Sequence, residues 1–508
     1  MFLSKGEDHV KTFLERAEGS PLEIIVGYEV PVQTMALLSS RTKQIGTLGF
    51  LNSRWTDLQS ISEVTSGLLP LLHTLGIDSI ETLTPPYITV TNPPMWDASP
   101  YTPTTDFIDA HTPSSVPLHP MWGASLHTPT TDFIDTDTNT DTTEEDDLDE
   151  FERNPPSLPL FSNAKNLKAL RFHSRSSQSP FVLDFVFPNL ASFDLSITKM
   201  GSLDFSQLFD FLEASPMLQT VNIEYIGYIY ADEVPPERVV FLPNVEKFTL
   251  IVSEGGYGYE MAAHMHCPSA RVTSIMLKST FEMIPEDIFP TPVSWDTILR
   301  HYTRSPPEEA ILEIRPEDPF TCKLTFGSSD STTISFGFIE IPDSNCYYYD
   351  TSYLDPWVPT IFAQATQAIH NHPQLANIKR LHLCHSFRPS AYVNEQPQTA
   401  KEVERLFSFL GPLDEMTIYH CDLRLYFRLS RIPPTKKLIL LHPVKLSGCM
   451  AGIVSLAKMQ HARRMPFERV VIRSDELLEG IEGLTSWVGG VEYSREKLHG
   501  WSDEWGLR

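Results

Sequence analysis

The chain has 508 residues, 41% of them hydrophobic, and a formal net charge of −26. This acidity argues against a nucleic-acid partner, because nucleic-acid-binding modules present a basic face. No apolar run approaches the roughly 18 residues that a membrane helix needs, so we expect no membrane partner. The six cysteines have no paired spacing, which predicts reduced thiols in a cytoplasmic or nuclear protein.

The first elements are a short amphipathic helix and a strand. Residues 7 to 17 place Val10, Phe13 and Leu14 on one helical face. A Gly-Ser-Pro stop follows, and residues 22 to 26 (LEIIV) have the composition of a strand.

An apolar triplet spaced L-x-x-L-x-L then recurs along the chain. Its clearest copies lie between residues 187 and 223, where each follows a proline by two residues and a helical pattern at 203–214 separates them. The copies are Ile45/Leu48/Phe50, Leu72/Leu75/Ile77, Leu167/Leu170/Phe172, Leu190/Phe193/Leu195, Leu218/Val221/Ile223, Val245/Phe248/Leu250, Val272/Ile275/Leu277, Ile378/Leu381/Leu383, Leu413/Met416/Ile418, Leu438/Leu440 and Phe467/Val470/Ile472.

The regular spacing predicts a fold of repeated coils. Helix, proline turn and short strand in succession are typical of leucine-rich repeats. We therefore expect an α/β fold, namely an irregular leucine-rich-repeat solenoid (a horseshoe) with parallel strands on its concave face and helices outside. The alternative is an ordinary α/β domain with buried strands.

One segment interrupts the repeats. Residues 92–157 are rich in Pro, Thr and acidic residues and contain TPTTDFID twice, at 102–109 and 128–135. Such a composition buries too little apolar surface to fold, which predicts a disordered insertion. The duplicated segment is either a short linear motif or a neutral linker.

These patterns divide the chain into five parts. Residues 1–91 hold the N-terminal helix and first repeats, 92–157 the insertion, and 158–284 the central repeats. Residues 285–356 form an irregular segment with a hairpin, which is either an irregular coil or a second insertion. Residues 357–508 hold the C-terminal repeats and a tryptophan-containing cap.

The candidate binding residues lie between and just after the triplet positions. Side chains alternate along a strand, so these residues should point out from the concave face, where such folds bind partners. The candidates are Arg171, His173, Asp194, Ser196, Asn222, Glu224, Thr249, Met276, Lys278, His382, Thr417 and Tyr419.

No residues have the spacing of a catalytic, metal or cofactor site. The clusters at 264–267 (HMHC) and 382–385 (HLCH) have neither C-x-x-C nor H-x₃₋₅-H spacing. The glycines at 255–258 (GGYG) lack the third glycine of the G-x-G-x-x-G pattern and have no recognisable helix start after them. We expect no cofactor, no metal and no enzymatic activity.

Several stretches resemble the region after the F-box in fungal F-box proteins of the agaric type. They are VKTFLERAEGSPLEIIV, RTKQIGTLGF, the Trp55-Thr56-Asp57-Leu58 element, LPLLHTLGI, FPNLASFDLSI and LPNVEKFTL. The resemblance implies repeats that select targets for a cullin-based ubiquitin ligase. No F-box-like opening is found in the sequence, so a Skp-type adaptor is expected as a partner only if an F-box lies upstream.

Two functions remain open from the sequence. The first is a non-enzymatic module that recognises protein targets on the concave face, as the substrate-binding part of F-box proteins does. The second is a leucine-rich-repeat scaffold or regulatory protein with no role in ubiquitin transfer.

Overall fold

The structure is a computed structural model. It describes residues 7–17, 19–26, 37–38, 40–51, 69–78, 164–174, 187–197, 205–225, 238–253, 257–279, 289–290, 292–315, 321–340, 357–371, 377–385, 396–419, 432–443, 450–475 and 480–495. The chain divides into two units, residues 1–82 with 155–508 and residues 83–154. All described residues belong to the first unit. The predicted insertion at 92–157 and its duplicated motif lie outside them.

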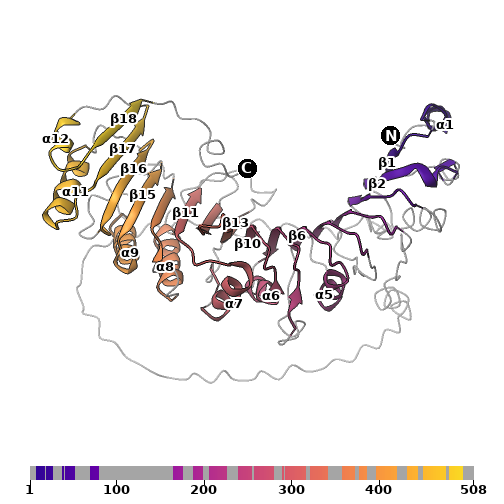
Figure 1. The fold of residues 1–508 in the computed structure, drawn as a ribbon, viewed down its shortest axis with the longest axis horizontal. Helices are drawn as coiled ribbons and strands as arrows, with labels where there is room; N and C mark the ends of the chain where they lie inside the picture. The colour runs from indigo at the N-terminus through magenta and orange to yellow at the C-terminus, as the bar shows by residue number, and fades with distance from the viewer. Residues whose placement is uncertain are drawn as a thin grey trace, which may run out of the picture. The chain divides into compact units, whose positions relative to one another are not determined.

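The first unit is built on one sheet of 16 strands (Figure 1). These are β1 (Leu22–Val26), β2 (Ile45–Leu51), β3 (Thr74–Asp78), β4 (Ala169–Ser174), β5 (Ser192–Ile197), β6 (Thr220–Tyr225), β8 (Lys247–Ser253), β10 (Val272–Ser279), β11 (Glu309–Arg315), β12 (Thr321–Gly327), β13 (Thr333–Glu340), β14 (Arg380–His385), β15 (Leu413–Tyr419), β16 (Thr435–Leu441), β17 (Arg469–Ser474) and β18 (Val491–Arg495). A separate pair consists of β7 (Val240–Phe241) and β9 (Met265–His266).

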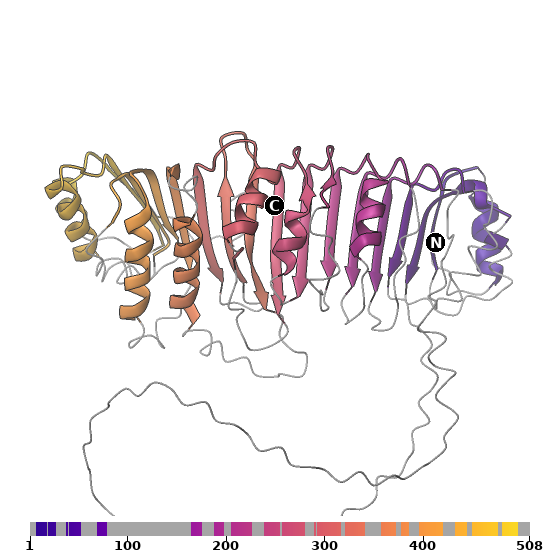
Figure 2. The same ribbon diagram turned by 90° about the horizontal axis from the view of Figure 1, so that it is seen from below.

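Eight α-helices lie in the described ranges, and those after β1 pack on one face of the sheet (Figure 2). They are α1 (Glu7–Arg16), α5 (Phe205–Glu213), α6 (Tyr257–Ala263), α7 (Pro292–Tyr302), α8 (Trp357–His370), α9 (Gln396–Phe409), α11 (Met450–Ala462) and α12 (Glu482–Thr485), with a 3-10 turn η1 (Thr42–Gln44). We call the opposite side of the sheet the open face. The result is an α/β fold with a large, mostly parallel sheet, consistent with a solenoid.

Strand order follows chain order except at one place. There the spatial order is β10-β13-β12-β11-β14, and β12 runs antiparallel to both of its neighbours. Because β13 pairs with β10 and β11 with β14, both in parallel, this three-stranded meander continues the sheet without a break.

Successive coils join through a repeated backbone turn. The Leu190 N–H donates to the Phe187 carbonyl at 3.0 Å, and equivalent turns close at Leu72, Leu167, Leu218 and Val245. At several of these joints, one carbonyl before the strand accepts two N–H groups from the next coil, as the Lys168 carbonyl does from residues 191 and 192 at 2.8 Å each. Each coil therefore fixes the position of the next.

Asparagine side chains reinforce three of these joints. Asn166 donates to the Pro70 carbonyl at 2.6 Å, Asn189 to Lys165 at 2.8 Å and Asn244 to Pro216 at 2.9 Å. Each donor lies one residue before a triplet. The repeat template places its asparagine after the triplet instead, which is why these donors were not predicted.

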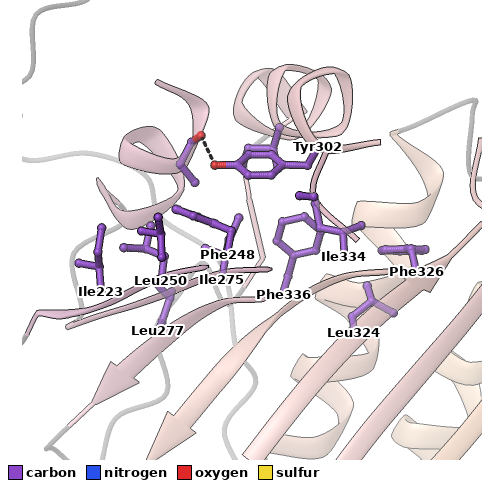
Figure 3. Packing of buried hydrophobic residues seen from close by; sticks show 14 of the residues in the cluster. Ile223, Phe248, Leu250, Ile275, Leu277, Tyr302, Leu324, Phe326, Ile334 and Phe336 are labelled. Atoms are coloured by element: carbon purple, nitrogen blue, oxygen red, sulfur yellow. Dashed lines mark hydrogen bonds between the residues drawn. The ribbon is translucent and has the colours of Figure 1, made fainter. Parts of the chain in front are cut away.

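The triplet side chains form the core between sheet and helices. Aromatic residues of the helices pack against them: Phe211 of α5 lies 4.7 Å from Phe193 between ring centroids, and Tyr302 of α7 lies 5.4 Å from Phe248. Tyr302 also donates a buried hydrogen bond to the Ala262 carbonyl at 3.1 Å (Figure 3).

Two residues that the apolar pattern placed in the core are exposed instead. Phe13 is 41% exposed, whereas Val10 and Leu14 of the same helix are buried. Val272 is 45% exposed, because the strand register pairs Thr273 with Phe248 and Ile275 with Leu250. The central buried position of that coil is therefore Thr273, two residues earlier than the apolar pattern indicated.

Candidate functional site

The open face carries polar side chains in two rows that run across the strands. The central row follows the register Gly76–Arg171–Asp194–Asn222–Thr249–Ser274. The second row follows Asp78–His173–Ser196–Glu224–Ile251–Met276. Parallel strands in register bring side chains from coils that are tens of residues apart within about 5 Å of one another.

Asp194 is the centre of a first polar cluster. Its carboxylate accepts from Arg171 Nε at 3.0 Å and from Asn222 Nδ2 at 3.0 Å, and it lies 3.5 Å from His173 Nε2. The Arg171 side chain is 67% exposed. This cluster therefore offers a partner both a cation and amide hydrogen-bonding groups.

Glu224 is the centre of a second cluster. It accepts from Ser196 Oγ at 2.7 Å and forms an ion pair with Lys278 Nζ, which reaches across β8 from β10. Burial by itself raises the pKa of the Glu224 carboxyl. The hydrogen bonds from Lys278 and Ser196 outweigh that effect, so the pKa is lowered and the group stays ionised.

Exposure divides the open face into two parts. The predicted candidates beyond β8 are buried: Met276 is 4% exposed, His382 6%, Thr417 2% and Tyr419 0%. On β4–β8 most candidates remain half-buried or exposed, namely Arg171, His173, Asp194, Asn222, Glu224 and Thr249. Ser196 and Lys278 are buried within the Glu224 cluster. Of the twelve predicted residues, we therefore assign these six to an accessible surface, which we call the β4–β8 surface.

Charged residues at the start of the later strands pair across the sheet. His382 Nε2 lies 2.9 Å from Glu309, Arg380 lies 3.3 Å from the same carboxylate, and Lys437 lies 2.8 Å from Glu415. The hydrogen bond from His382 is the largest of the effects that lower the pKa of Glu309. These ion pairs join neighbouring strands, so we assign their charges to holding the coils together.

The histidine cluster at 264–267 is held by structural contacts. His264 Nδ1 lies 2.6 Å from the Arg238 carbonyl, His266 stacks on His301 at 4.9 Å, and Cys267 is buried. Within the described ranges, no group of three or more His, Cys, Asp or Glu side chains could hold a metal ion. Contrary to expectation, a helix does start at the glycine segment 255–258: α6 begins at Tyr257 and includes Gly258.

Neither a protein-family model nor a curated protein matches the chain. Across the described segments, no helix combines the length and apolar character needed to span a bilayer. The function must therefore be argued from the β4–β8 surface itself.

Proposed function

We propose that the chain is a non-enzymatic protein-recognition module, built as an irregular leucine-rich-repeat solenoid, that binds a protein on the β4–β8 surface. The observation that carries the proposal is the continuous row of accessible Arg171, Asp194, Asn222 and Thr249 side chains, held in register by the sheet. A rigid backbone presents these groups at low entropic cost to a partner, as repeat proteins do along their strand face.

The mixed chemistry of the surface supports a protein partner. Cation, carboxylate, amide and hydroxyl groups alternate along the row, and such a pattern complements peptide groups and charged side chains rather than a uniform polyanion. We propose further that the target is one selected for ubiquitin transfer, as the resemblance to F-box proteins implies. A scaffold role with no link to ubiquitin is the competing proposal.

A charge substitution on the surface tests the first proposal. The full chain with Thr249→Arg introduces a bulky cation in the middle of the row, and Lys401→Glu on the exposed side of α9 serves as the control. We expect proteins captured with wild type to be lost with Thr249→Arg and retained with Lys401→Glu, both variants melting as wild type does. Retention by both variants refutes the β4–β8 surface as the binding site.

Binding to a purified Skp-type adaptor separates the two proposals about ubiquitin. Association of the adaptor with this chain supports the F-box relation. Failure to associate, together with partners that carry no ubiquitin, favours the scaffold.

A further inference from the structure

The C-terminal end of α11 and the turn that follows it are exposed and basic. Residues 461–466 (HARRMP), which we call the basic turn, are six consecutive exposed residues. They include His461, Arg463 and Arg464, together with Met465, which is 47% exposed. Basic residues and an exposed apolar side chain thus share one short segment of a strongly acidic chain.

The backbone of the basic turn is held in a fixed conformation. The Met465 N–H donates to the Gln460 carbonyl at 3.1 Å and the Arg464 N–H to the His461 carbonyl at 2.9 Å, which together form a Schellman motif. The Gln460 side chain is buried and bonds the Pro433 carbonyl at 3.2 Å, so the end of the helix is anchored to the preceding coil.

Arg464 occupies a position that favours glycine. Its φ is 60°, the left-handed value of the residue that ends a Schellman motif, where a side chain is unfavourable. A strained exposed residue that the fold does not require points to a role for its side chain. Here that side chain is a guanidinium.

The charge of Arg464 is also uncompensated in the described part of the chain. Other cations of the C-terminal coils have partners: Lys436 lies 2.7 Å from Asp414, and Arg469 pairs with Glu492. The guanidinium of Arg463 donates to the Ile432 carbonyl at 3.5 Å. Lys458 and His461 instead contact the Trp487 ring, at 5.3 Å and 5.5 Å. No acidic residue occurs within α11 or the basic turn.

We propose that the basic turn is a second docking site, which binds an acidic segment of a partner protein that also carries an apolar side chain. Carboxylates complement the exposed guanidinium of Arg464, and the apolar side chain covers Met465. Nucleic acid and anionic membranes fit less well, because the net charge of −26 repels an extended polyanion while a short segment experiences only the local cations. This site does not depend on the β4–β8 surface.

The test uses the full chain and a fluorescent synthetic peptide of glutamate and leucine, titrated at low salt. Arg464→Gly removes the cation and relieves the backbone, so we expect binding to weaken about fivefold while the melting temperature rises. Arg464→Lys keeps charge and conformation and should bind within about twofold of wild type. Lys401→Gln, which removes one exposed cation from α9, should bind as wild type does.

Several results overturn the proposal. Wild type that fails to bind the peptide, or an Arg464→Gly variant that binds it equally well, removes the docking site. Tighter binding to polyuridylate RNA or to phosphatidylserine vesicles than to the peptide assigns the turn to another class of partner. A lower melting temperature for Arg464→Gly contradicts the argument from backbone strain.

Discussion

Replacing Gly337 by alanine should disrupt the meander that carries the sheet across its middle. Gly337 of β13 pairs with Lys323 of β12 and with Met276 of β10. A Cβ at this position would lie 2.0 Å from the Cys322 carbonyl oxygen and 2.9 Å from the Lys323 Cα. Both are backbone atoms, so no side-chain rotation relieves the contact.

The expected loss follows from this geometry. A carbon–oxygen contact needs about 3.3 Å, so the two strands must separate by more than an ångström. Such overpacking costs about 1–3 kcal/mol, and each cross-strand hydrogen bond that is lost adds about 1 kcal/mol. We expect Gly337→Ala to destabilise the protein by about 3–5 kcal/mol.

Gly76 supplies a matched control. It also lies inside a strand on the open face, but a Cβ there meets no atom within 4 Å. Alanine restricts the unfolded chain without a clash, so Gly76→Ala should be neutral or stabilise by about 0.5–1 kcal/mol.

Urea unfolding and amide hydrogen exchange distinguish the two variants. Gly337→Ala should lower the unfolding midpoint and speed amide exchange in β11–β13, whereas Gly76→Ala should do neither. Equal stability of the two variants would refute the close approach of β12 and β13.

Three further outcomes are expected. Asn189→Ala should lose about 1 kcal/mol of unfolding free energy, measured in urea. Met217→Asn, which places a donor at a coil that lacks one, should gain up to that amount; no change in either variant would show that these bonds contribute nothing. The lowered pKa of Glu224 means that its contribution to stability is present above 4.5, the ordinary value, and is lost as pH falls through the folded pKa. Glu224→Gln should therefore unfold with a weaker dependence on acid pH, and an unchanged acid profile would contradict the ion pair. Burial raises the pKa of the Cys267 and Cys322 thiols, so in the native protein both should resist iodoacetamide at mildly alkaline pH and react only after unfolding; labelling of either native thiol would contradict its burial.

The strands were predictable because their signal is local. A triplet of the form Leu190/Phe193/Leu195 records which side chains face the helices, and all three are buried. The position of β13 beside β10 was not predictable, because neither strand's own pattern specifies its neighbour. The triplet at Val272 was placed two residues too late. Ile275 and Leu277 match the last two apolar positions of the template, although the register makes Thr273 and Ile275 the residues at those positions.

The face on which the candidate residues lie was predictable, but their exposure was not. Alternation along a strand places Arg171 and Thr417 on the open face alike. Their accessibility differs, since the Arg171 side chain is 67% exposed and Thr417 is 2% exposed. The Lys278–Glu224 pair joins residues 54 apart in sequence through the side chain alone. Such contacts depend on strand register, which no single segment encodes.

Site-specific photo-crosslinking tests the central claim most directly. A photoreactive amino acid is placed either at Asn222 on the β4–β8 surface or at Lys401 on α9, in the full chain inside cells. The account predicts covalent adducts with a discrete protein partner from position 222, abolished by Thr249→Arg, and none of that partner from position 401. The same adducts from both positions, or from 401 alone, would contradict a recognition surface on the open face.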